Sequence, residues 1–283
     1  MSKLTGINTD LSGKVGKYLF RQTPTGTVVS QLPRKPSIPR RSERQQNRRT
    51  LLGNLAAFYR LFDGSLRRGF EGTPPGQNAF NAFIKANINN SGIYITKDEK
   101  SHGGAVVAPY LITFGSLPSI AATLNSGTLQ SNIALGDLTV YERTKVSAFA
   151  RAVIDNNDSF LENDAITFFL ITQGKDEVTR VPRAVFSRQK VVLSLSDDRP
   201  LWSLVDKRGF SAANNMLSMG IALEDAGAAW VHSRHEDDTL RVSTQSLIVR
   251  NGMVDQYRSD DARKKAIASY GGVNKKAVYL DPL

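Results

Sequence analysis

A change in the pattern of polar and apolar positions marks the stretch from residue 33 to 62. A Pro/Arg run occupies 33–41, and Ser42 with Gln45 three residues later then predicts a capped helix start. The apolar positions that follow are spaced like one face of an α-helix that stops at Gly64. They are Leu51, Leu52, Leu55, Phe58, Tyr59 and Phe62. The first half of this helix is polar and basic, so we expect it to face water or an acidic partner, while the second half joins a core.

Weaker patterns flank this helix on both sides. Apolar residues at 13–20 and 27–30, separated by a Thr/Pro/Gly turn at 23–27, predict a β-hairpin. A second amphipathic helix is predicted at 80–88 after a glycine-rich connection at 69–76. Two amphipathic helices joined in this way predict a helical hairpin.

From about residue 92 the apolar positions alternate with a period of two, as in strands. Strands are predicted at 93–95, 105–114, 121–135 (with loop), 165–172, 185–186, 191–195, 216–224, 229–233 and 240–250, with a short helical turn at 201–205 and a hairpin loop at 235–239. Thr139 with Glu142 predicts a helix over 139–155, and Ser259 caps a last helix over 260–270. The tail at 278–280 is expected to add an edge strand to a sheet.

The predicted fold class is therefore α+β. An N-terminal β-hairpin arm and a helical hairpin precede a mostly antiparallel β-rich body, sandwich- or barrel-like, with one inserted and one C-terminal helix. The expected division is a basic extended arm at 1–41, the helical hairpin at 42–90 and the body at 91–283, with helices near 139–155 and 260–270.

Charge is distributed very unevenly along the 283 residues. Residues 1–70 contain 14 Lys/Arg and 3 Asp/Glu, whereas residues 71–283 contain 23 of each, so the whole formal charge of +11 lies in the first quarter. Such an asymmetry indicates a basic arm that faces a polyanion or an acidic protein surface. A solvated basic tail is the alternative.

The residues expected to contact a partner lie in this basic region. They are Arg34, Lys35, Arg40, Arg41, Arg44, Arg48 and Arg49, together with Tyr18 and Phe20 of the hairpin. No aromatic residue occurs between Phe20 and Phe58, so the basic stretch offers no platform for stacking bases. What remains is contact with phosphates without sequence recognition, or docking on an acidic protein.

Catalytic, cofactor and metal motifs are absent from the sequence. The chain has no cysteine, no phosphate-binding glycine loop and no nucleophile elbow to accompany His102-Gly103-Gly104. His232 and His235 stand three apart, which on a strand places them on opposite faces, and we expect them near a solvated hairpin tip. We expect no enzyme, no cofactor and no metal site. The apolar runs are too short to cross a membrane and no signal-peptide core is present, so we expect a soluble protein of a cytoplasm.

Several short stretches resemble an uncharacterised family of Bacteroidota and phage proteins, a domain of unknown function. They are Gly13-Lys14-Val15-Gly16, the helix at 45–58 with its preceding Pro/Arg run, the helix at 80–88, Phe114-Gly115-Ser116-Leu117, the segment 156–168, Val231-His232-Ser233-Arg234 and Val242-Ser243-Thr244-Gln245. Such genes occur in prophages and crAss-like phages among structural genes. The resemblance implies a virion protein, a neck or tail ring subunit.

Two hypotheses follow for the function. In the first, the chain is a bacteriophage structural protein that forms a closed homo-oligomeric ring of the neck or tail, such as a portal–tail connector or tail barrel. Its basic arm would then contact neighbouring subunits, other ring, portal or tail proteins and, non-specifically, DNA. In the second, it is a cytoplasmic nucleic-acid-binding or accessory protein that uses the basic stretch 34–49.

Overall fold

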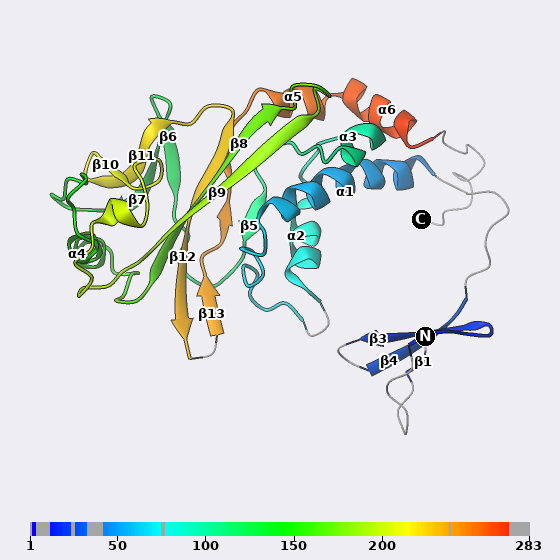
Figure 1. Ribbon diagram of the computed structural model, residues 1–283, viewed down its shortest axis with the longest axis horizontal. Helices are drawn as coiled ribbons and strands as arrows, with labels where there is room; N and C mark the ends of the chain where they lie inside the picture. Colours follow the sequence, from blue (N-terminus) through cyan, green and yellow to red (C-terminus); the bar gives the residue numbers. More distant parts are fainter. Residues whose placement is uncertain are drawn as a thin grey trace.

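The computed structural model describes residues 2–3, 12–23, 26–32, 42–74, 77–237 and 239–271. Its elements confirm the predicted α+β class: an N-terminal β-arm and helical segments accompany mostly antiparallel sheets (Figure 1). The predicted edge strand at 278–280 lies outside these residues. Within them, no helix has the length and apolar character needed to cross a membrane.

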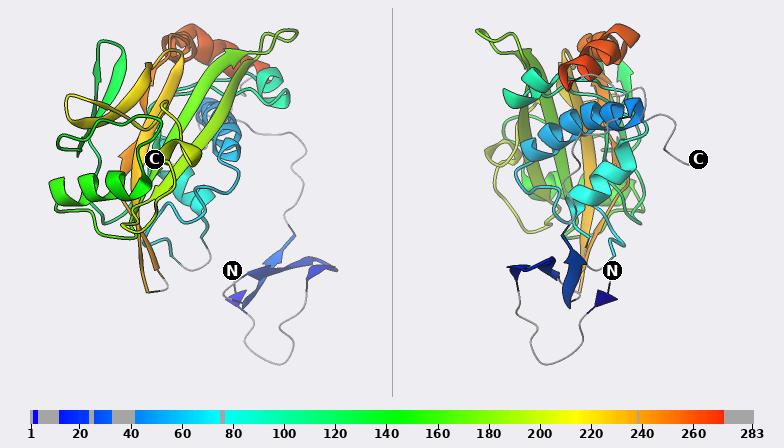
Figure 2. Two further views of the ribbon diagram at one scale, coloured as in Figure 1. Left: turned by 60° about the vertical axis from the view of Figure 1, so that its left-hand side comes forward. Right: turned by 90° about the vertical axis from the view of Figure 1, so that its right-hand side faces the viewer.

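The N-terminal arm is a small antiparallel sheet. Its strands are β1 (Ser2–Lys3), β2 (Gly13–Val15), β3 (Tyr18–Thr23) and β4 (Gly26–Gln31), in the order β1-β4-β3-β2. The predicted hairpin is confirmed as β3–β4, but the single strand expected at 13–20 is wrong. Gly16 adopts a φ of 58°, a left-handed conformation that glycine accepts without strain, and the chain reverses there. In Figures 1 and 2 this sheet stands apart from the body.

The predicted helical hairpin is present as α1 (Glu43–Leu61) and α2 (Ala79–Asn87). The capping box is confirmed: Ser42 Oγ accepts from the Gln45 N–H, and Gln45 Oε1 accepts from the Ser42 N–H, both at 3.2 Å. The two helices meet through aromatic rings, with Phe58 stacked on Phe83 at 6.4 Å between centroids. Leu55, Phe58 and Phe83 are fully buried.

A long antiparallel sheet forms the centre of the body. Its strands are β8 (Ala165–Lys175), β9 (Pro182–Val192), β12 (Ala226–Glu236) and β13 (Thr239–Val242), in the order β13-β12-β8-β9, with β15 (Ile248–Arg250) also paired to β12. Figure 2 shows α1 crossing one face of this sheet. On that face Phe169 and Val231 share a core with α1 and α2, and Phe62 meets Phe169 edge-on at 5.9 Å.

The opposite face of the central sheet carries a second core. It packs against α4 (Val146–Asn156), the short helix η1 (Leu201–Ser203) and a second sheet of β6 (Ala122–Asn125), β7 (Thr128–Ala134), β10 (Ser211–Ala213) and β11 (Met216–Ala222). Phe168 and Trp230 lie here with ring centroids 5.0 Å apart, and Trp230 Nε1 donates to the Gly209 carbonyl at 2.8 Å. Because β8 and β12 are covered on both faces over part of their length, the segments 165–171 and 226–231 are apolar apart from Thr167.

The remaining elements complete the helix-covered side. They are α3 (Lys97–Ser101), α5 (Met253–Arg258), α6 (Asp260–Ser269) and a two-stranded pair of β5 (Leu111–Thr113) with β14 (Gln245–Ser246). The Ser259 cap of α6 is confirmed, with Ser259 Oγ accepting from the Ala262 N–H at 3.1 Å. Neither α3 nor α5 was predicted, because each is too short to show helical periodicity.

The strand predicted at 105–114 is wrong over most of its length, because only 111–113 is a strand. The buried chain before it is held by amide side chains in place of a neighbouring strand. Asn54 Oδ1 accepts from the Val106 N–H at 2.8 Å, and Gln173 Oε1 accepts from the Val107 N–H at 2.8 Å. Asn87 exchanges two hydrogen bonds with the Leu111 backbone, each about 2.8–2.9 Å.

Other element boundaries also differ from the predictions. The inserted helix does not start at Thr139: its first amides, of Val146 and Ser147, donate to carbonyls of the 197–199 loop, and α4 begins there without a side-chain cap. The segments predicted at 185–186 and 191–195 are not separate strands: 185–186 and 191–192 belong to β9, and 193–195 lie beyond its end. The single strand predicted at 240–250 is split into β13, β14 and β15, and between β14 and β15 the Leu247 N–H donates to the Tyr110 carbonyl. The strand predicted at 93–95 is an irregular segment.

We expect Leu55→Ala or Phe58→Ala to lower the free energy of unfolding by about 2–5 kcal/mol, because each leaves a cavity in the core shared by α1, α2 and the central sheet. Leu52 on the same helix is 41% exposed and provides the matched control. Leu52→Ala should change stability by less than about 0.5 kcal/mol in urea titrations. Equal effects at the two leucines would contradict the packing.

We expect Asn87→Ala to destabilise the fold by about 1–3 kcal/mol, because it leaves the buried Leu111 N–H without an acceptor. Asn90 follows the same helix and bonds only through its backbone within the described chain. Asn90→Ala should leave the thermal melting temperature nearly unchanged, and a comparable fall in both variants would disprove the role given to Asn87.

Candidate functional site

The N-terminal sheet has one apolar face. Its register places Val15 opposite Tyr18 and Phe20 opposite Val29, so these four side chains lie on the same side of the sheet. Val15 is 60% exposed and Tyr18 is 53% exposed, while Phe20 and Val29 are partly buried. A sheet this small is marginal in water unless its apolar side is covered. Tyr18 and Phe20, predicted as contact residues, are thus brought together on one face, on which Tyr18 is exposed and Phe20 is partly buried among the described residues.

The opposite face of the same sheet is mixed and carries two basic side chains beside two apolar ones. Lys14 lies opposite Leu19 and Arg21 opposite Val28. Within 2–3, 12–23 and 26–32 the charged residues are Lys3, Lys14, Lys17 and Arg21, and no aspartate or glutamate accompanies them. The arm therefore has apolar residues on both sides, and the side with Lys14 and Arg21 also offers positive charge to an acidic surface.

The basic residues predicted on the first helix are partly accounted for. Arg44, Arg48 and Arg49 are exposed on α1, and Arg49 donates to Gln46 Oε1 at 3.5 Å. Arg34, Lys35, Arg40 and Arg41 lie outside the described residues. That the basic stretch 34–49 contacts a partner, either DNA or an acidic protein, stays a prediction.

The polar half of α1 also has an internal role that the sequence pattern did not predict. Gln46 is fully buried, and its Nε2 donates to the Gly271 carbonyl at 3.1 Å. The exposed arginines are thereby held on a helix start that is docked against the end of α6.

A second polar cluster lies inside the body, and it corrects the expected position of His232. This histidine is fully buried in β12, whereas His235 is exposed toward the end of that strand. His232 Nε2 lies 2.7 Å from Asp164 Oδ2, and Arg234 bonds both oxygens of Asp164 at 2.7–2.8 Å. The Phe160 ring stacks on His232 at 4.2 Å. The expected solvated hairpin tip is therefore wrong for His232, because the strand continues past it into the sheet.

The cluster keeps Asp164 ionised. Burial pushes the pKa of this carboxyl up, but hydrogen bonds from Arg234 and then His232, with one from the Leu161 N–H, outweigh burial and lower the pKa from 3.8 to about 2. Asp164 is 1% exposed and His232 is 0% exposed, so no substrate reaches either side chain. The arrangement ties β8 to β12 and to the Ser159 carbonyl, which Arg234 contacts at 2.9 Å. Its role is structural.

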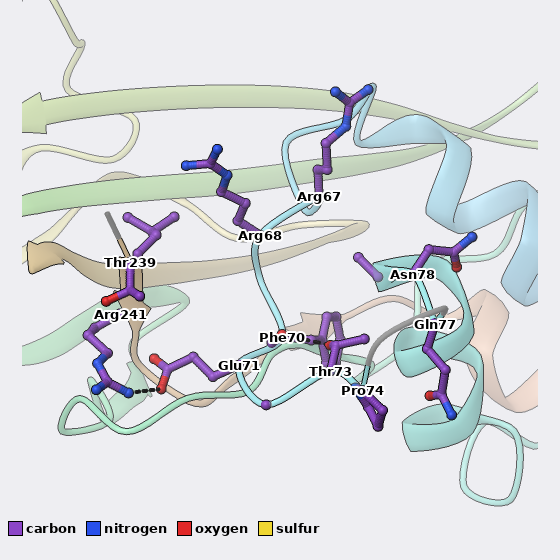
Figure 3. Close-up of a pocket in the computed structure, with 13 residues that line it drawn as sticks. Arg67, Arg68, Phe70, Glu71, Thr73, Pro74, Gln77, Asn78, Thr239 and Arg241 are labelled. Atoms are coloured by element: carbon purple, nitrogen blue, oxygen red, sulfur yellow. Dashed lines mark hydrogen bonds and ion pairs between the residues drawn. The ribbon is translucent and has the colours of Figure 1, made fainter. Parts of the chain in front are cut away.

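A cationic groove lies where the loop after α1 meets the central sheet (Figure 3). Two adjoining cavities, of about 540 and 130 Å³, share Arg68 and Leu240 in their linings. The larger lies between the loop at 67–74, the start of α2 and β13, and the smaller lies over the ends of β8, β9 and β12. We call the two together the cationic groove.

One carboxylate lines this groove in the described residues, and it is already bound. Glu71 accepts from the Val242 N–H at 2.5 Å and the Ser116 N–H at 3.1 Å, and it pairs with Arg241 at 3.4 Å. Burial raises the pKa of Glu71, but these hydrogen bonds outweigh it and hold the pKa below its ordinary value. Figure 3 shows Arg241 reaching Glu71 while Arg67 and Arg68 extend away from it.

Metal-binding groups do not gather anywhere in the described ranges, where no cluster of three or more His, Asp or Glu side chains could hold an ion. Comparison with known proteins identifies no similar protein. No family model, curated protein or solved structure matches the chain. The resemblance to a phage protein family stays a prediction.

Sequence reasoning missed the cationic groove, although part of its signal was visible. Arg67 and Arg68 form a dibasic pair directly after the helix stop at Gly64, and Arg188 and Lys190 stand two apart on a strand. Residues two apart on a strand share a face. The meeting of these two pairs depends on the packing of α1 across the sheet, which no local pattern reveals.

We expect Asp164→Ala to lower the free energy of unfolding by about 3–5 kcal/mol, because it leaves Arg234 and the buried His232 without their carboxylate. Asp158 is exposed in the preceding loop and serves as the control. Asp158→Ala should stay within about 0.5 kcal/mol of the original protein in the same urea titration.

The same carboxylate predicts a pH dependence. Because the folded pKa of Asp164 lies below its unfolded value, its stabilisation is fully present above about pH 4 and is lost as the pH falls toward 2. The original protein should therefore lose more stability than Asp164→Ala over this interval. Parallel stability curves for the two proteins would show that the cluster does not hold the charged carboxylate.

Proposed function

We propose that the chain is a structural subunit that assembles with copies of itself into a closed ring through its N-terminal arm. The observation that carries the proposal is the apolar face formed by Val15, Tyr18, Phe20 and Val29, on which Val15 and Tyr18 are exposed among the described residues. Removing such surface from water stabilises an assembly by roughly 25 cal/mol per Å². We take a neighbouring subunit to be the partner that covers this face, because every copy of the chain carries the same apolar face.

The charge distribution supports contact between unlike surfaces. The arm is cationic, whereas residues 71–283 carry 23 basic and 23 acidic residues. An arm that leaves one subunit and docks on the body of the next makes a head-to-tail contact, and such contacts either close into a ring or continue as a filament. The Pro/Arg run at 33–41 supports the idea that the arm extends to the next subunit. Each proline fixes its own φ and favours extended backbone in the residue before it.

The resemblance to phage proteins supports a location of such a ring in a virion. A ring subunit of a bacteriophage neck or tail would have portal, ring or tail proteins as partners, and the virion as its location. The protein would act through binding alone, without catalysis or a cofactor.

Deletion of residues 1–40 tests the proposal. We expect the original protein to sediment as a large species and the truncated protein as a smaller one with an unchanged melting temperature, since the described arm strands pair only with one another. Light scattering coupled to size exclusion measures the masses. An original protein that is monomeric at high concentration, or a truncated protein that still assembles, would show that the arm does not build the ring.

A double substitution tests the apolar face itself. Val15→Ser with Tyr18→Ser should weaken assembly, because it removes the exposed apolar pair. Val178 and Tyr141, 90% and 55% exposed on the body, provide a matched control pair. Val178→Ser with Tyr141→Ser should leave the mass unchanged, and an equal loss in both doubles would point to general solubility rather than a specific contact.

A further inference from the structure

The face of the central sheet that packs against α1 extends beyond the area that the helices cover. On β9, Phe186 packs in the core shared with α1, and Arg188 and Lys190 continue on the same face. The register sets Arg188 opposite Phe169 and Lys190 opposite Thr167 on β8. Beyond α1, the sheet thus presents a polar and cationic surface, which is the floor of the smaller cavity of the cationic groove.

Four cations of this groove have no carboxylate partner among the described residues, whereas Arg241 in the same groove is bound by Glu71. Elsewhere Arg199, Arg208 and Arg234 each bond an aspartate at 2.7 Å. Among the described residues, no ion pair forms at Arg67, Arg68, Arg188 or Lys190. Four positive charges gathered around one groove repel each other, and a bound polyanion would relieve that repulsion.

Hydroxyl donors accompany these cations. Ser233, which is partly exposed, lines the smaller cavity, and its hydroxyl takes part in no hydrogen bond within the described chain; Thr167 also lines the cavity but is 8% exposed. Arg188 is steadied by a hydrogen bond from its Nη1 to Ser65 Oγ at 3.2 Å. Arginine, lysine and Ser/Thr hydroxyls are the groups that contact phosphate and sugar oxygens in protein–nucleic acid complexes.

The geometry points to the phosphodiester backbone of nucleic acid as the ligand, and we propose that the cationic groove binds it without reading its sequence. The two cavities adjoin through Arg68, so the charges follow an elongated path that suits a chain of repeated anions better than a single one. The aromatic residues of the lining, Phe70 and Phe169, are 9% and 4% exposed, so they offer no stacking surface for bases. This site is on the body and does not depend on the role proposed for the arm.

The test compares two double variants of the full chain that lose the same charge. Arg68→Gln with Lys190→Gln removes cations from the groove, whereas Arg143→Gln with Lys207→Gln removes exposed cations outside both cavities. Binding of a labelled random-sequence DNA duplex is measured by fluorescence anisotropy over a series of salt concentrations. Melting temperatures confirm that both variants fold.

We expect the slope of log affinity against log salt to decrease in magnitude by about 2 for the groove variant, one for each lost phosphate contact, and to change little for the control. Equal changes in both variants would show that DNA responds to net charge alone and would overturn the proposal, as would absence of DNA binding at low salt. Polyglutamate is the competing ligand. If it binds the original protein and loses affinity with the groove variant while DNA does not, the groove receives an acidic protein and the proposal is wrong.

Discussion

Four amide side chains, three of them buried and Asn251 partly buried, hold the layers of the body together. Asn54 from α1, Asn87 from α2, Gln173 from β8 and Asn251, whose Nδ2 donates to Val107 O at 2.9 Å, all bond to the irregular chain at 105–111. Buried backbone groups without partners cost about 1–3 kcal/mol each, so this chain could not lie between helices and sheet without them. The helix layer, the groove at its margin and the presentation of the basic start of α1 all depend on that docking.

The body and the arm differ in how their apolar side chains are removed from water. In the body, the central sheet buries both faces within one chain. The arm has an apolar face of its own but too few residues to fold over it, and the described strands β1–β4 pair only among themselves. If the proposed assembly covers Val15 and Tyr18, the stability of the arm is linked to that assembly.

The sequence allowed prediction of those features that depend on neighbouring residues. The capping box at Ser42 and the cap at Ser259 were predicted correctly, because each is a contact between residues three apart. Features that join distant residues escaped prediction: Asn54 meets Val106, and Asp164 meets His232, across more than 50 positions. Of the expected contact residues, Tyr18 and Phe20 lie on one face, and the cationic groove on the body was not foreseen.

The double burial of the central strands has a consequence for how the chain finds its pairing during folding. A strand that is apolar on both faces can shift along its neighbour without exposing polar groups to the core, so the usual pattern does not fix its alignment. Long-range contacts distinguish the alignments here: His232 and Arg234 of β12 bond Asp164 directly before β8, and Gly209 packs against both strands. A Cβ atom at this position would lie 2.1 Å from the Phe168 ring, and its carbonyl accepts from Trp230 Nε1. The observed register, with Phe168 opposite Trp230, brings both large rings to this one glycine, so any larger residue at 209 would displace the Phe168 ring.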